Sequence, residues 1–111
     1  MLGHTGKIDA TIQAIETIDQ CLGQIMPIVK THGAHWFITA DHGNAECLYN
    51  PNLKQPHTAH TQNPVPLVYY GPKNITLAEQ GRLSDIAPTI LSLMRIKQPQ
   101  DMAGISLVTA E

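Results

Sequence analysis

The sequence is poor in the features that mark several large classes of protein. No stretch approaches the roughly 20 consecutive apolar residues that a transmembrane helix needs, so we expect no membrane span. Lysine and arginine are not clustered, and the net charge of −2 argues against a nucleic-acid or anionic membrane partner. Gly3, His4 and Gly6 stand where a secretory signal would need a basic start and an apolar block. We therefore expect a cytoplasmic protein.

Cysteine, arginine and nucleophile motifs are also scarce. Cys21 and Cys47 have no paired spacing, so we expect free thiols, with Cys21 as a small core residue. Arg82 and Arg95 are the two arginines, too few for a substrate clamp. No serine lies in a nucleophile-like context, and no glycine-rich loop of the P-loop type is present. We therefore predict no catalytic nucleophile and no organic-cofactor site in this chain.

Apolar periodicity predicts two helices. The 111 residues, 42% of them hydrophobic, suit one domain with a modest core. A first helix over 7–31 is predicted to bury its apolar stripe, with Pro27 causing a kink or break and Gly33 following the last turn. A second helix over 85–95 is predicted to be capped by Ser84. The residues expected to face inward are Ile8, Ile12, Ile15, Ile18, Leu22 and Ile25 in the first helix, and Ile86, Ile90, Leu91, Leu93 and Met94 in the second.

Two apolar runs, near 36–41 and 65–70, read as strands, and a short third strand is expected at Ile75 and Leu77. The long connection over 41–64 favours a parallel α/β sheet. An antiparallel hairpin would contradict that arrangement, because the loop would then be an ordinary connector. So small a sheet rarely covers both its faces, so we expect one edge of a larger domain, with exposed apolar surface that promotes self-association.

Candidate metal ligands gather at the end of the first strand and in the long loop. Asp41 and His42 follow an apolar run, and the carboxyl ends of parallel strands are where open α/β sheets bind ligands. His57 and His60 lie in the loop, and His4 lies between glycines before the first helix. Oxygen and nitrogen donors suit Mn²⁺, Co²⁺ or Zn²⁺, whereas Mg²⁺ prefers oxygen and water. A capping aspartate with surface histidines is the alternative.

Four blocks of sequence together resemble one known family. They are Met-Leu-Gly-His-Thr-Gly over 1–6, Thr-Ala-Asp-His-Gly-Asn-Ala-Glu over 39–46, Gln-Pro-His-Thr-Ala-His-Thr-Gln-Asn-Pro-Val-Pro over 55–66, and Ser-Asp-Ile-Ala-Pro-Thr over 84–89. The chain resembles the C-terminal part of cofactor-independent phosphoglycerate mutases, which belong to the alkaline phosphatase superfamily. The resemblance implies an α/β fold, a partial alkaline-phosphatase-like parallel sheet with flanking helices. Residues 1–111 would be a single C-terminal fragment of a metal-binding phosphatase-type domain.

The resemblance also implies site roles. Asp41 and His42 would bind one Mn²⁺, and His4 and His60, rather than His57, would bind the other, with Co²⁺ or Zn²⁺ as alternative metals. In the family an aspartate ligand stands four positions before the residue that matches His4, a position ahead of Met1. The serine nucleophile, its neighbouring aspartate ligand, the catalytic lysine and the substrate-binding arginines would also lie upstream, outside this sequence.

The implied activity is that of an isomerase in glycolysis, which interconverts 3-phosphoglycerate and 2-phosphoglycerate through a phosphoserine intermediate. The partner would be this small phosphorylated substrate, and the isolated chain would be inactive. A free-standing metal-binding or interaction module of the same ancestry is the alternative, to be distinguished by whether the coding sequence continues upstream with an aspartate directly before Met1. A fragment of another phosphatase or phosphomutase of the superfamily is disfavoured by the block over 55–66.

Overall fold

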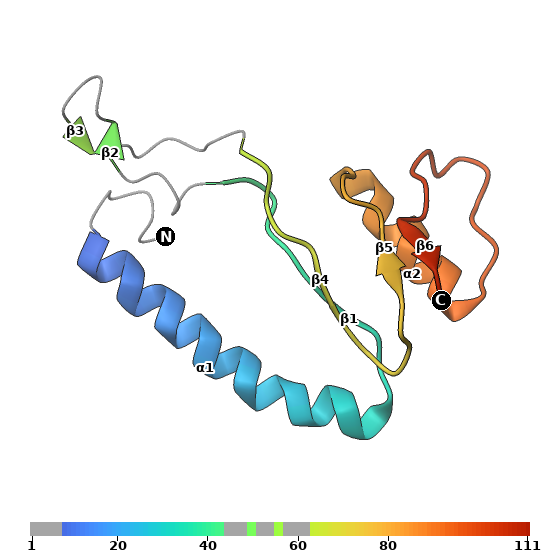
Figure 1. Ribbon diagram of the computed structural model, residues 1–111, viewed down its shortest axis with the longest axis horizontal. Coiled ribbons are helices and arrows are strands. Elements are labelled where there is room, and N and C mark those ends of the chain that lie inside the picture. Colours follow the sequence, from blue (N-terminus) through green and yellow to red (C-terminus); the bar gives the residue numbers. More distant parts are fainter. Residues whose placement is uncertain (1–7, 44–48, 51–54, 57–62) are drawn as a thin grey trace.

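The structure is a computed structural model that describes residues 8–43, 49–50, 55–56 and 63–111. It combines helices with small sheets, so the predicted α/β class is confirmed (Figure 1). Among the described residues, no helix is long and apolar enough to cross a membrane. The elements are, in order, α1 (Ile8–His32), β1 (Trp36–Ile38), β2 (Tyr49–Asn50), β3 (Gln55–Pro56), β4 (Val68–Tyr70), β5 (Thr76–Leu77), the 3₁₀ helix η2 (Leu83–Asp85), α2 (Ile86–Met94) and β6 (Val108–Ala110).

The described strands form antiparallel pairs. β1 and β4 pair antiparallel, with Phe37 opposite Tyr69 at the centre of the register. The prediction of a parallel arrangement is therefore wrong. Parallel strands need a crossover that returns the chain to its starting end. Here the chain runs outward along β1 and comes back along β4, and the antiparallel pair β2–β3 lies at the far tip (Figure 1). Ligand binding at the carboxyl ends of parallel strands therefore no longer supports a metal site at Asp41 and His42.

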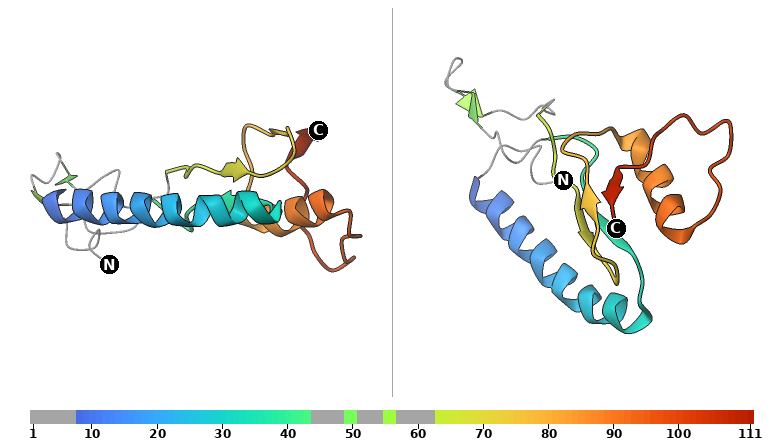
Figure 2. Two further views of the ribbon diagram at one scale, coloured as in Figure 1. Left: turned by 90° about the horizontal axis from the view of Figure 1, so that it is seen from below. Right: turned by 45° about the vertical axis from the view of Figure 1, so that its right-hand side comes forward.

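Helix α1 is continuous over 25 residues and passes through Pro27, so the predicted break does not occur. Proline removes one backbone donor, and near this point the Thr31 hydroxyl donates to the Pro27 carbonyl oxygen at 2.8 Å. Gly33 follows the last turn, as predicted, with a φ of +60° that suits glycine. The end of α1 lies near the start of β1, and from there the helix and the β1–β4 ribbon diverge (Figure 2).

The apolar stripe of α1 is not buried as predicted. Four of its isoleucines keep half or more of their surface exposed, namely Ile8 at 56%, Ile12 at 50%, Ile15 at 52% and Ile18 at 57%. Cys21 is exposed as well, not a core residue. The apolar repeat determines which face of a helix can be buried, but burial also requires another helix or strand packed against that face. Exposed apolar surface was expected beside the strand near 36–41, whereas here it lies on α1.

The core lies in the C-terminal part, where α2 packs against the chain from β5 to β6. Leu93 is 2% exposed, and Pro88 and Thr89 are fully buried. The N-cap of α2 is Asp85 rather than the predicted Ser84, because η2 precedes the helix directly. Met94, expected inside, is 55% exposed. Strand β6 near the C-terminus pairs antiparallel with β5.

Candidate metal centre

Asp41 and His42 lie just beyond β1, in a segment that is tied to the chain leading into β4. The tie is a hydrogen bond of 2.8 Å, which the Thr39 hydroxyl donates to the Pro66 carbonyl oxygen. Apolar residues Trp36–Ile38 form the strand, and the chain leaves it where polar side chains begin. The register of β1 against β4 therefore sets where the carboxylate and the imidazole stand.

The two side chains are close together and differ in exposure. His42 Nε2 lies 3.4 Å from Asp41 Oδ1, with the Asp41 side chain 81% exposed and the His42 side chain 24% exposed. His42 Nδ1 lies 3.0 Å from the Gly43 carbonyl oxygen. The contacts with Gly43 and Asp41 together orient the imidazole ring. Metal-binding histidines are commonly oriented by such a backbone contact.

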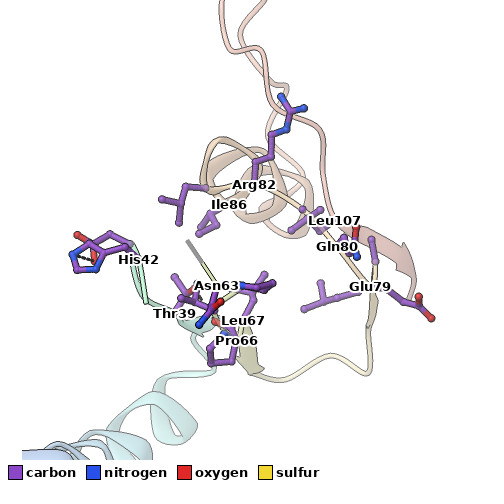
Figure 3. A pocket seen from close by; sticks show the side chains of 17 residues that line it. Thr39, His42, Asn63, Pro66, Leu67, Glu79, Gln80, Arg82, Ile86 and Leu107 are labelled. Carbon is purple, nitrogen blue, oxygen red and sulfur yellow. Dashed lines mark hydrogen bonds and ion pairs between the residues drawn. The ribbon is translucent and has the colours of Figure 1, made fainter. Parts of the chain in front are cut away.

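Asp41 and His42 line a cavity of about 770 Å³ between the two halves of the described chain. One side is formed by Thr39 and residues 63–67, and the other by the segment Leu77–Leu83, which we call the wall, together with Ile86 and Leu107. In Figure 3, His42 lies across the cavity from Gln80 and Glu79. Asp41 and His42 thus lie at the border of a space large enough for a small ligand, with largely apolar side chains around it.

The structure brings together two of the four predicted ligands. Asp41 and His42 are adjacent, whereas His4, His60 and the alternative His57 lie outside the described residues. Within the described ranges, no group of three or more His, Cys, Asp or Glu side chains converges on a metal position. One carboxylate oxygen and one imidazole nitrogen fit the donor preferences of Mn²⁺, Co²⁺ or Zn²⁺. The described part therefore contains two of the predicted ligands side by side, and the other two lie outside it.

Sequence reasoning missed two features near the site. His35 is half-buried, and its Nδ1 lies 2.8 Å from the Tyr69 hydroxyl, with the two rings stacked at a centroid distance of 5.9 Å. The period-two pattern of a strand, which puts residues 35 and 37 on one face, was the signal that pointed there. The wall opposite Asp41 and His42 gave no local signal, because its position depends on how β5 and β6 pair.

Comparisons with known proteins agree with the resemblance seen in the sequence. The family description of the Metalloenzyme superfamily matches residues 1–98. The chain is 52% identical over 112 residues to the 2,3-bisphosphoglycerate-independent phosphoglycerate mutase of Francisella philomiragia, covering 100% of this chain and 22% of that protein. It is 54% identical over 108 residues to the enzyme of that name from Hahella chejuensis, covering 97% of this chain and 21% of that one.

A solved structure gives the same result for the fold. The phosphoglycerate mutase of Leishmania mexicana, determined at low cobalt concentration, is similar with a TM-score of 0.81 and 27% identity. The match covers 98% of this chain and 23% of that chain. The chain thus spans about 22% of the length of the curated relatives that it matches. Since the family match extends over most of its residues, the chain belongs to the Metalloenzyme superfamily.

Proposed function

We propose that residues 1–111 are a single C-terminal portion of the metal-binding, phosphatase-type domain of a phosphoglycerate mutase. The intact enzyme would interconvert 3-phosphoglycerate and 2-phosphoglycerate in glycolysis, in the cytoplasm. The observation that carries this proposal is identity of 51–54% to mutases along the whole of this chain. The placement of Asp41 and His42 on one cavity supports it.

In the proposed reaction this chain holds metal rather than attacking the substrate. Asp41 would bind through its carboxylate and His42 through Nε2, in place of the contact that Nε2 makes with Asp41 Oδ1 at 3.4 Å. A divalent metal held there would neutralise charge on a phosphoryl group and on the oxygens that attack and leave it. The contact between Thr39 and Pro66 would keep the two ligands at a fixed place beside the cavity. Mn²⁺ is the proposed metal, with Co²⁺ and Zn²⁺ as alternatives.

A second metal would be held by His4 and His60. The test compares His60→Ala with His57→Ala, introduced at the corresponding positions of a full-length relative loaded with Mn²⁺. The two loop histidines are close in sequence and chemically alike, so each variant controls for the other. His60→Ala is expected to reduce turnover far more than His57→Ala. Equal losses, or a larger loss at His57, would refute the assignment.

By itself the chain is expected to bind metal weakly and to have no mutase activity. Each proposed site has two protein ligands here, fewer than the three or four that hold a transition metal firmly. Without a nucleophile, no covalent phosphoryl intermediate forms. A coupled assay of 3-phosphoglycerate conversion with Mn²⁺ and a calorimetric Mn²⁺ titration test both points. Turnover above background would overturn the first expectation, and sub-micromolar binding would overturn the second.

The isolated chain is also expected to self-associate. The isoleucines that α1 exposes make an apolar face of the kind that soluble monomers rarely keep. A dimer, a higher species, or exchange of α1 between copies would cover that face. Sedimentation velocity over a range of concentrations measures this directly. A strict monomer at high concentration would contradict the expectation.

A further inference from the structure

The C-terminal segment over 105–110, which we call the strap, is held between α2 and β5. On its α2 side, two alternate backbone N–H groups are bound by side chains. Ile105 N donates to Asp85 Oδ1 at 2.9 Å, and Leu107 N donates to Thr89 Oγ1 at 2.9 Å. On its other side, the strap continues into β6, which pairs with β5. Side chains near the start of α2 therefore act as the neighbouring strand would in a sheet.

Asp85 links the strap to the wall of the cavity. Its second carboxylate oxygen, Oδ2, accepts a hydrogen bond of 2.8 Å from the backbone N–H of Arg82, a wall residue. One carboxylate thus binds an N–H of the wall and an N–H of the strap at the same time. A charged acceptor makes stronger hydrogen bonds than a neutral one, and a carboxylate has room for both.

Leu107 joins the strap to the wall at further points. Its carbonyl oxygen accepts a hydrogen bond of 2.8 Å from Ala78 N. Its side chain is 8% exposed, and a Cβ added at Gly81 would lie 2.6 Å from it. Leu107 also lines the cavity itself. The wall between Ala78 and Arg82 therefore rests on the strap along its length.

Thr89 completes the attachment from inside the core. It is fully buried, and its hydroxyl donates to the Asp85 carbonyl oxygen at 2.6 Å while it accepts from Leu107 N. The hydroxyl therefore makes one hydrogen bond as a donor and one as an acceptor within the protein. Removing it would leave the buried Leu107 N–H without its acceptor, which is costly.

We propose that Asp85 and Thr89 are positioning residues for the candidate metal centre. They fix the strap through Ile105 and Leu107, and the strap fixes the wall, which lines the same cavity as Asp41 and His42 (Figure 3). The importance of that wall to catalysis rests on the proposed function. The attachment itself does not, so the two are tested separately.

The test measures amide hydrogen exchange in the 111-residue chain. Thr89→Val and Asp85→Asn are compared with Thr17→Val and Asp101→Asn. Thr17 makes the same local bond, from its hydroxyl to the Gln13 carbonyl oxygen at 2.9 Å, but it lies in α1 rather than beside the strap. Asp101 gives the same change of charge at an exposed position. Exchange at Ile105, Leu107 and Ala78 is expected to rise roughly tenfold in the first pair, as for loss of one buried hydrogen bond, and to stay nearly unchanged in the controls.

Thr89→Ser keeps the hydroxyl and is expected to restore slow exchange, which a role in packing alone would not predict. An acid titration of the unaltered chain adds a measurement that needs no variant. The amide signals of Ile105 and Arg82 are expected to shift together as Asp85 takes up a proton, because both N–H groups donate to its carboxylate. The charged side chain of Arg82 also acts on this carboxylate. Unchanged exchange in Thr89→Val, or independent titration of the two amides, would overturn the proposal. A chain whose strap responds but whose Asp41 and His42 signals are untouched at saturating Mn²⁺ would leave the attachment standing and contradict the metal-binding role of those two residues instead.

Discussion

Helices α1 and α2 are both amphipathic in sequence, yet they have opposite fates in the structure. α1 has 25 residues and leaves half or more of several isoleucines exposed. α2 has 9 residues and buries Pro88, Thr89 and Leu93. The difference is the partner. α2 meets the strap and the wall, whereas in the described residues no sheet face lies close along α1. Burial thus follows from what the chain brings opposite a helix, not from the strength of its periodicity.

The largest expected contrast is between a core leucine and an exposed isoleucine. Leu93→Ala removes a side chain that is 2% exposed, and is expected to lower the free energy of unfolding by about 2–5 kcal/mol. Ile15→Ala removes one that is 52% exposed, and alanine favours helix, so a change under about 1 kcal/mol is expected. Urea unfolding followed by circular dichroism measures both. Similar losses for the two variants would contradict the contrast.

Two glycines are expected to respond with opposite sign. A Cβ at Gly104 would collide with the Ser84 carbonyl group and crowd Pro88, so Gly104→Ala is expected to destabilise by about 1–3 kcal/mol. A Cβ at Gly23 in α1 would meet nothing within 4 Å, so Gly23→Ala is expected to stabilise by about 0.5–1 kcal/mol. The same unfolding measurement applies. Stabilisation by Gly104→Ala would show that α2 and the strap are not packed as described.

A substitution in the β1–β4 pair is expected to change the free energy of unfolding by an amount between the changes for Gly104→Ala and Gly23→Ala. Tyr69→Phe removes the hydroxyl that lies 2.8 Å from His35 Nδ1 and keeps the ring that packs on Phe37. A loss of about 0.5–1.5 kcal/mol is expected for this hydrogen bond. Tyr70→Phe is the control, because the described residues offer its hydroxyl no hydrogen-bond partner while its ring contacts Trp36 edge-on. Equal losses of stability in the two variants would contradict a stabilising hydrogen bond between Tyr69 and His35.

Acid is expected to loosen the strap before it affects α1. Backbone N–H groups of Ile105 and then Arg82 stabilise the charged carboxylate and lower the pKa of Asp85. Because the folded value is the lower one, this contribution is complete above the ordinary aspartate pKa of about 4 and is lost as the pH falls through the folded value. Amide protection of Ile105 should decrease over that range, and the α1 amides serve as the reference. Loss of protection on raising the pH would contradict the sign.

The sequence predicts the elements better than it predicts their arrangement. Both helices, both main strands and the turn at Gly33 are found where periodicity and glycine placed them. The direction of β4 is not, because the length of a connection does not determine whether the chain returns beside its own strand. Asp85 as the cap and the pairing of β6 with β5 also escaped prediction. Both depend on contacts between segments far apart in the chain, for which the local sequence carries no signal.

For the candidate site, the sequence placed Asp41 and His42 side by side because they are adjacent after a strand. It did not predict the contact of His42 Nδ1 with the Gly43 carbonyl oxygen, or that the wall over 77–83 would line the same cavity. Nor did it predict the contact of His35 with Tyr69. The roles of His4 and His60 stay predictions from the resemblance, since both lie outside the described residues.

The most direct test of the account is paramagnetic broadening of NMR signals during a Mn²⁺ titration of the chain and of its His42→Ala variant. Binding by Asp41 and by Nε2 of His42 predicts saturable broadening centred on these two residues, lost in His42→Ala. In a matched His32→Ala variant, which removes an exposed histidine at the end of α1, the broadening should persist. Broadening centred elsewhere, or unchanged by His42→Ala, would contradict the claim that Asp41 and His42 form a metal site.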